Sequence, residues 1–115
     1  MKLGDKRSVK RTFSAEDIQL FARFSGDEGE HHLVPDDQGR LMAHGLLTAT
    51  LPTRIGGDMN FIAQQMMFEF HRPVFAGDEI ECVVTVIELE PGEKQVRLGA
   101  QCICRNQDGK CRQKN

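Results

Sequence analysis

The chain has 115 residues, a formal net charge of −2 and a sequence pI of about 6.1. This length corresponds to one domain with one hydrophobic core. Charges of both signs are spread along the chain, so there is no basic patch of the kind that binds nucleic acid. No apolar run approaches the roughly 18 residues of a membrane-spanning helix, and the N-terminus lacks the apolar stretch of a secretory signal. We therefore expect a soluble, cytoplasmic protein without a nucleic-acid or membrane partner.

The first predicted element is a short helix between Ser14 and Gly26. Serine is a favourable N-cap, and two acidic residues follow it in the first turn. Apolar residues then recur at helical spacing, at Ile18, Phe21, Ala22 and Phe24. Residues 1–10 are a candidate for disorder. Residues 27–41 are polar and have no period, which predicts a loop.

A second helix is predicted from Leu46 to Ile55, where most residues are apolar. The pair Gly56-Gly57 after it is typical of a helix end. Pro52 lies inside this pattern and has no N–H to bond to the carbonyl of Thr48. We therefore expect a kink, or the end of the regular helix, near this proline.

After Gly57 the apolar period changes from the helical value to two, which is typical of strands. Strands are predicted at residues 60–72, 78–90 and 94–106. The Asn-Gln-Asp-Gly segment at 106–109 predicts a hairpin turn, and residues 110–115 a return strand. A buried helix followed by antiparallel strands with one apolar face predicts an α+β fold, in which a curved sheet wraps around the central helix.

The four cysteines are Cys82, Cys102, Cys104 and Cys111. Three of them fall in the alternating patterns of the predicted strands, so we interpret them as small buried hydrophobic residues. The i, i+2 spacing of Cys102 and Cys104 differs from the CxxC loop of many metal sites.

Two neighbouring segments carry residue types that suit acid–base chemistry. The first holds Asp27 and His32 five positions apart. A carboxylate and an imidazole can act together on one water molecule. The second runs through His44 and Gly45 into the second predicted helix, where N–H groups can hold a developing oxyanion. Together they indicate an enzyme that adds water to an activated carbonyl compound, or removes it.

These residues also have structural interpretations. Asp27 could close a turn after the first helix, and His44 could be a structural residue at a helix start. A metal site from His31, His32 and the Asp36-Asp37 pair is a weaker alternative, because no standard ligand spacing is present. We therefore predict no metal.

Three motifs occur in the order found in one known family. Its members carry Gly-Asp-x-Asn-Pro-x-His after a short helix, and the chain matches this motif at Gly26, Asp27 and His32. Residues 42–45 match Ile-Ala-His-Gly at the start of the central helix, and residues 70–78 match Phe-x-x-Pro-Val-x-x-Gly-Asp in full. The chain thus resembles the MaoC-like, (R)-specific enoyl-CoA hydratases of the hot-dog fold, over about residues 12–110.

This resemblance implies a single hot-dog domain over residues 1–115 and an enoyl-CoA hydratase or 3-hydroxyacyl dehydratase, a lyase. Asp27 and His32 would hold the water that adds to a trans-2-enoyl thioester and gives the (R)-3-hydroxyacyl thioester, with Asp27 as the base. The N–H of Gly45 would polarise the thioester carbonyl, with His44 in a structural role beside it. Coenzyme A or acyl carrier protein would be part of the substrate, and no bound cofactor is implied. Relatives are dimers, so we expect a homodimer or a higher homo-oligomer.

Two other functions remain open. A hot-dog acyl-CoA thioesterase would direct a carboxylate and water at the same thioester carbonyl, although the Asp-x4-His spacing favours the hydratase. A catalytically degenerate acyl-binding or dimerisation module is the second alternative. It is favoured by Gly29 and Glu30, which occupy the Asn-Pro positions of the family motif, and by the polar residues 110–115.

Overall fold

The computed structural model describes residues 2–114, so Met1 and Asn115 lie outside the described residues. Its five-stranded antiparallel sheet has the order β1-β3-β4-β5-β2. The strands are β1 (Lys6–Thr12), β2 (Glu69–Phe70), β3 (Glu79–Pro91), β4 (Val96–Arg105) and β5 (Cys111–Lys114). The helices are α1 (Ala15–Ser25), α2 (Glu30–Leu33), α3 (Gly45–Thr48) and α4 (Thr50–Asp58). None of the helices within residues 2–114 combines the length and the apolar character needed to span a membrane.

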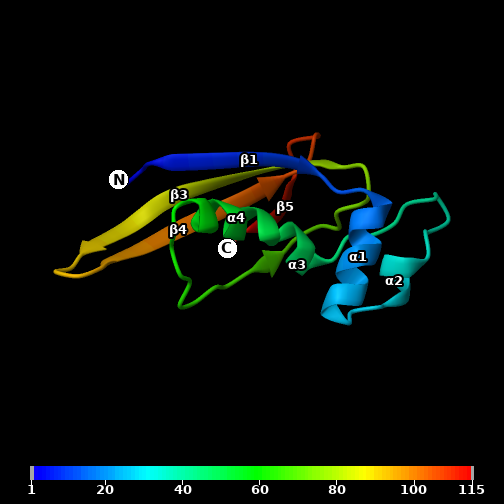
Figure 1. Ribbon diagram of the computed structural model, residues 1–115. Coiled ribbons are helices and arrows are strands. Elements are labelled where there is room, and N and C mark those ends of the chain that lie inside the picture. Colours follow the sequence, from blue (N-terminus) through cyan, green and yellow to red (C-terminus); the bar gives the residue numbers. More distant parts are fainter. Residues whose placement is uncertain (1, 115) are drawn as a thin grey trace.

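The helices α3 and α4 lie along one face of the sheet, while α1 and α2 lie at one end of it (Figure 1). Leu47 of α3 and Leu51 of α4 pack in one core with Ile80 and Cys82 of β3. Burial of these side chains supplies the main driving force for holding the helices on the sheet. The prediction of an α+β fold, with an antiparallel sheet packed against central helical segments, is confirmed.

The central helix is divided where its sequence predicts an irregularity. Helix α3 ends at Thr48 and α4 begins at Thr50, with Ala49 between them. The break lies beside the carbonyl of Thr48 that Pro52 cannot satisfy with an N–H. Helix α4 then continues through Gly56-Gly57 and ends at Asp58, slightly later than predicted.

The first predicted helix is confirmed as α1. The Ser14 Oγ accepts a hydrogen bond from the N–H of Asp17 at 3.1 Å, and the N–H of Ser14 donates to Asp17 Oδ2 at 2.9 Å. The hydrogen bond from the Ser14 backbone N–H to the Asp17 carboxylate is the main reason why the pKa of Asp17 is lowered. At the other end Gly26 has φ 81°, a left-handed conformation that glycine adopts without strain. Because α1 ends at Gly26, Asp27 is the first residue of the segment that follows the helix.

The expected disorder at residues 1–10 is wrong for residues 6–10, because Lys6–Thr12 form β1, and Met1 lies outside the described residues. Strand β1 pairs with β3, with Val9 opposite Cys82. Its side chains are exposed apart from the partly buried Val9, so the strand has no alternating apolar pattern. Backbone pairing with β3 holds this segment, and that pairing leaves no local signal in the sequence.

The predicted strands at 78–90 and 94–106 are confirmed as β3 and β4, whereas the strand predicted at 60–72 is mostly wrong. Only Glu69–Phe70 form β2, which pairs with β5 in the register Glu69 to Lys114 and Phe70 to Gln113. The apolar side chain of Ile62 is 92% exposed, so the alternating pattern there does not face the core.

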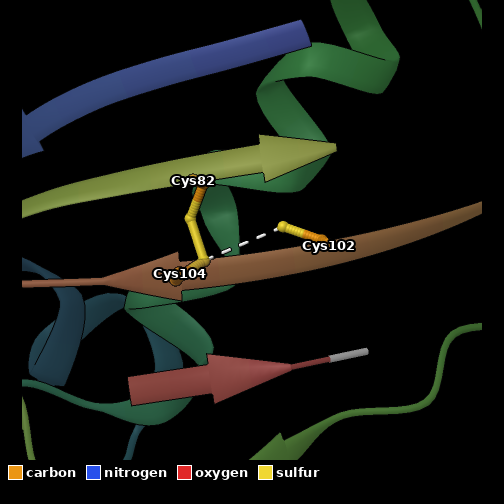
Figure 2. Close-up of side chains that lie close together, drawn as sticks. All are labelled: Cys82, Cys102 and Cys104. Atoms are coloured by element: carbon orange, nitrogen blue, oxygen red, sulfur yellow. Dashed lines mark hydrogen bonds between the residues drawn. A yellow bond between two sulfur atoms is a disulfide. The ribbon is translucent and has the colours of Figure 1, made fainter. Parts of the chain in front are cut away.

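The interpretation of the cysteines as buried hydrophobic residues is incomplete. Cys82 on β3 and Cys104 on β4 lie opposite each other and form a disulfide. Figure 2 shows Cys102 on the same strand as Cys104, with its sulfur 3.8 Å from the sulfur of Cys104. All three are buried, and burial raises the pKa of Cys102 to about 11. The disulfide depends on the register between two strands, which the spacing of cysteines along the chain does not specify.

Candidate active site

Asp27 follows the end of α1 and is held by a local turn. Its N–H donates to Ser25 Oγ at 3.1 Å, and its Oδ1 accepts from the N–H of Gly29 at 3.3 Å. The structural interpretation of Asp27 as a turn residue therefore holds for this oxygen. The second oxygen, Oδ2, lies 3.7 Å from Nε2 of His32, and the side chain is 59% exposed. One carboxylate oxygen is thus left for chemistry.

His32 belongs to α2, a single turn of helix inside the segment predicted as a loop. Its Nδ1 lies 2.8 Å from the backbone oxygen of Met42. Since a carbonyl only accepts, Nδ1 carries a proton, and Nε2 is the ring nitrogen directed toward Asp27, where it is an acceptor in the neutral form of the ring. The distance of 3.7 Å between Nε2 and the Asp27 carboxylate exceeds a direct hydrogen bond. A bridging water suits such a separation.

His44 contacts both Asp27 and His32. Its ring stacks on the ring of His32, with 3.7 Å between centroids and 18° between planes. Its Nε2–H donates to the backbone oxygen of Asp27 at 2.9 Å, and Phe21 of α1 packs edge-on against it. With 2% exposure, His44 connects the backbone of Asp27 to the ring of His32. The structural role predicted for His44 beside Gly45 therefore extends further, because His44 contacts both Asp27 and His32.

Gly45 is the first residue of α3, and its N–H donates to no acceptor within residues 2–114. The aromatic ring of Phe70 lies against its Cα. A Cβ at position 45 would lie 2.5 Å from Cε1 of Phe70, so any residue other than glycine requires the Phe70 ring to move. The close approach of Phe70, and not an unusual φ, explains this glycine.

Asp27, His32 and Gly45 line one cavity of about 430 Å³. The structure therefore brings together the residues predicted from two separate motifs, with His44 behind them. Further lining residues that the sequence analysis missed are Thr48, Phe70, Arg112 and Gln113. Thr48 shares a helix face with Gly45, three residues earlier, so helical spacing could have identified it. Phe70, Arg112 and Gln113 reach the cavity through the pairing of β2 with β5, and no local sequence pattern marks them as site residues.

The alternative metal site does not form as the sequence analysis considered it. Asp36 accepts hydrogen bonds from the backbone N–H of Arg40 at 2.8 Å and from its guanidinium at 3.0 Å. The first of these contacts is the main reason why the pKa of Asp36 is lowered. Within the described residues, the histidine-containing group that could approach a metal ion is instead Asp27, His32 and His44, whose ligand atoms lie within 4.8 Å of one another.

Comparisons with known proteins, first by sequence and then by structure, find hydratases and a dehydratase. The chain is 34% identical over 113 residues to an (R)-specific enoyl-CoA hydratase from Rhodospirillum rubrum, which covers 89% of this chain and 77% of that protein. It is 32% identical over 112 residues to a 3-hydroxybutyryl-CoA dehydratase from Methylorubrum extorquens, covering 89% of this chain and 71% of that protein. No family model matches the chain.

Among solved structures, an (R)-hydratase from A. caviae involved in PHA biosynthesis superposes with a TM-score of 0.87. The identity is 26%, and the superposition covers 99% of this chain and 92% of that one. Two relatives are thus more than 30% identical to the chain, and one solved hydratase shares its backbone arrangement. Both findings point to the family whose motifs contribute residues to the cavity. The chain belongs to the MaoC-like, (R)-specific enoyl-CoA hydratase family of hot-dog enzymes.

Proposed function

We propose that the protein catalyses the reversible addition of water to trans-2-enoyl thioesters, which gives (R)-3-hydroxyacyl thioesters. The observation that carries this proposal is the pair of Asp27 Oδ2 and His32 Nε2, 3.7 Å apart at the wall of the cavity. Both atoms are hydrogen-bond acceptors, so one water molecule can donate to each of them. The two curated relatives, a hydratase and a dehydratase, support this direction and its reverse.

In the hydration direction, the water oxygen forms a bond to C3 of the enoyl group and the C2–C3 π bond breaks. The Asp27 carboxylate accepts one proton of the water as this bond forms. A proton is delivered to C2 through the same Asp27–His32 pair, so that one water is added in total. The hydrogen bond from His32 Nδ1 to Met42 keeps Nε2 available for the water.

The N–H of Gly45 completes the proposed site. Negative charge develops on the thioester oxygen while water adds, and an N–H group that has no other acceptor can stabilise it. This role is supported by the position of Gly45, the first residue of α3, in the lining of the cavity that Asp27 and His32 also line. We assign His44 as a positioning residue, because it contacts both members of the pair and does not line the cavity.

Hydration of crotonyl-CoA, followed by the loss of enoyl absorbance, tests the proposed function. We expect turnover to the (R)-3-hydroxybutyryl product, identified with a stereospecific dehydrogenase. Release of thiol without hydration would identify the acyl-CoA thioesterase instead. Binding without either reaction would favour the catalytically degenerate acyl-binding or dimerisation module.

We also propose that the protein forms a homodimer or a higher homo-oligomer. Strands β1 and β2 are the two outer strands of the sheet, and open edges are usually paired or covered. Large apolar side chains are also exposed, among them Ile62, Met67, Ile87 and Val96. Light scattering at tens of micromolar protein should give at least twice the monomer mass. A monomer at that concentration would contradict this part of the proposal.

The acyl carrier in this proposal is coenzyme A or acyl carrier protein, both of which present the acyl group as a thioester. We place the reaction in the cytoplasm, where both carriers occur. Rates with matched crotonyl thioesters of the two carriers would identify the preferred one, and cell fractionation would test the location. Recovery of the protein in a non-cytoplasmic fraction would contradict the location.

A further inference from the structure

Three residues that line the cavity carry buried polar atoms that the proposed hydration does not use. Within residues 2–114, Thr48 Oγ1, Arg112 Nε and Gln113 Oε1 are buried and have no hydrogen-bond partner. All three residues line the cavity that holds Asp27 and His32. Thr48 and Gln113 are each 2% exposed. Buried polar groups are usually paired, so unpaired ones that line a binding cavity indicate polar contents.

These side chains lie close to the place proposed for the thioester carbonyl. Thr48 follows Gly45 by three residues, so both lie on one face of α3, about 5 Å apart along the helix axis. Gln113 pairs across the sheet with Phe70, whose ring touches the Cα of Gly45. On its other side, Gln113 pairs with the buried Cys104, so it faces the helices. Thr48 and Gln113 therefore lie on the elements next to Gly45, on the side of the sheet that faces the helices.

The charge of the cavity also favours an oxygen-rich group. Arg72 and Arg112 line it, and neither has a carboxylate within ion-pair distance among residues 2–114. Asp27 is the one acidic residue of the described lining. A plain alkyl chain would leave the polar atoms unsatisfied and displace any water from them, which is unfavourable.

Building on the proposed function, we infer that this site takes a short enoyl chain that bears an oxygen substituent, a hydroxyl or a carboxylate, at its far end. A hydroxyl can accept from Thr48 or Arg112 and donate to Gln113 Oε1. A carboxylate can accept from Thr48 and Arg112 and is attracted by the two arginines. The unsubstituted crotonyl chain makes none of these contacts.

The test compares trans-2-enoyl-CoA substrates that differ at the chain end: crotonyl-CoA, 4-hydroxycrotonyl-CoA and glutaconyl-CoA, which ends in a carboxylate. We expect kcat/KM for at least one oxygenated substrate to exceed that for crotonyl-CoA by about tenfold, the effect of one ordinary net hydrogen bond. Thr48→Val should remove this preference, while Thr48→Ser, which keeps the hydroxyl, should retain it. A preference for the hydroxyl should also be lost with Gln113→Leu, because Gln113 Oε1 accepts from a hydroxyl and cannot donate to a carboxylate. A preference for the carboxylate should persist with Gln113→Leu and be lost with Arg112→Met.

Thr50→Val is the matched control. The Thr50 hydroxyl already donates to the backbone oxygen of Leu47 at 2.6 Å, and Thr50 does not line the cavity. The chain-end preference should therefore persist in this variant. Equal or better activity with crotonyl-CoA in the wild type would overturn the inference. It would also be overturned if Thr48→Val and Gln113→Leu changed all three substrates equally, as expected if these atoms hold only water.

A binding experiment separates failure of this inference from failure of the proposed function. Calorimetry with Asp27→Asn measures the dissociation constants of the same three thioesters without turnover. If the wild type hydrates none of them, the proposed function fails, but a preference for an oxygenated chain end in binding still supports the inference. Tightest binding of crotonyl-CoA would overturn the inference even if hydration is observed.

Discussion

The imidazole ring of His44 is stacked on that of His32, 3.7 Å away and nearly parallel. The same side chain donates a hydrogen bond to the backbone oxygen of Asp27, seventeen residues earlier in the chain. The two groups that face the proposed water are thus positioned by one buried ring. This relationship separates residues that act on the water from a residue that holds them, and mutations can distinguish the two.

Asp27→Asn should remove most hydratase activity and leave the fold intact. The amide keeps an oxygen that can accept from the N–H of Gly29, so the turn is retained. It cannot accept a proton as the carboxylate does, and a general base typically contributes about 10² to 10⁴ in rate. The measurement is kcat/KM for crotonyl-CoA together with the thermal unfolding midpoint. Asp37→Asn, a change at an exposed loop residue, is the control, and equal rates for the two variants would contradict the prediction.

His44→Ala should show a different combination of effects. It removes a buried ring and leaves the Asp27 carbonyl without its donor, so we expect a loss of about 2–4 kcal/mol in the free energy of unfolding. The fall in activity should be smaller than for Asp27→Asn, because His44 does not line the cavity. His44→Gln, whose amide can still donate, should recover part of both properties. A fully active and equally stable His44→Ala variant would show that the positioning role is wrong.

The double change Gly29→Asn and Glu30→Pro should raise activity. Gly29 is the N-cap of α2, has φ −55°, and makes no side-chain cap hydrogen bond. Asparagine is a favoured N-cap and proline suits the first helical position, so the turn that carries His32 should be more stable, by about 1 kcal/mol for the cap. The new Cβ at position 29 would lie 2.9 Å from Cε1 of His31, an exposed side chain that can rotate away.

The control for this pair is Gly29→Ala with Glu30→Ala, which adds the Cβ at position 29 without a side-chain cap and does not fix φ at position 30. Steady-state rates with crotonyl-CoA compare the two double variants with the wild type. If the Asn-Pro variant gains no activity over the Ala-Ala variant, the loop does not limit the reaction. If the wild type and the Asn-Pro variant are both inactive, the non-catalytic module becomes the better account.

Reduction of the Cys82–Cys104 disulfide should destabilise the protein. The bond closes a segment with a sequence separation of 22, for which the loss of unfolded-state entropy corresponds to about 3 kcal/mol. The thermal midpoint should therefore fall when a reductant is added. The variant Cys82→Ala with Cys104→Ala should not respond to reductant, whereas Cys111→Ser should respond like the wild type. A midpoint that is the same with and without reductant in the wild type would refute this prediction.

The sequence by itself determined the elements that depend on neighbouring residues. The Ser14 cap and Gly26 define α1, and an apolar period of two marks β3 and β4. The short spacing from Asp27 to His32 and the glycine at the start of α3 identified the candidate site before the fold was known. Caps, periodicity and motif spacing act over a few residues, so they can be read along the chain.

The tertiary structure alone decided which distant residues meet. Strand β1 has no apolar pattern and is held by its ladder with β3, while the apolar pattern at 60–68 finds no partner strand within the described residues. Strand register brings Cys82 to Cys104 and Gln113 to Phe70, and packing places His44 under His32. These distances depend on register and core packing over the whole sheet, because each strand is positioned by partners far away in the sequence. Local patterns carry no information about that choice of partner.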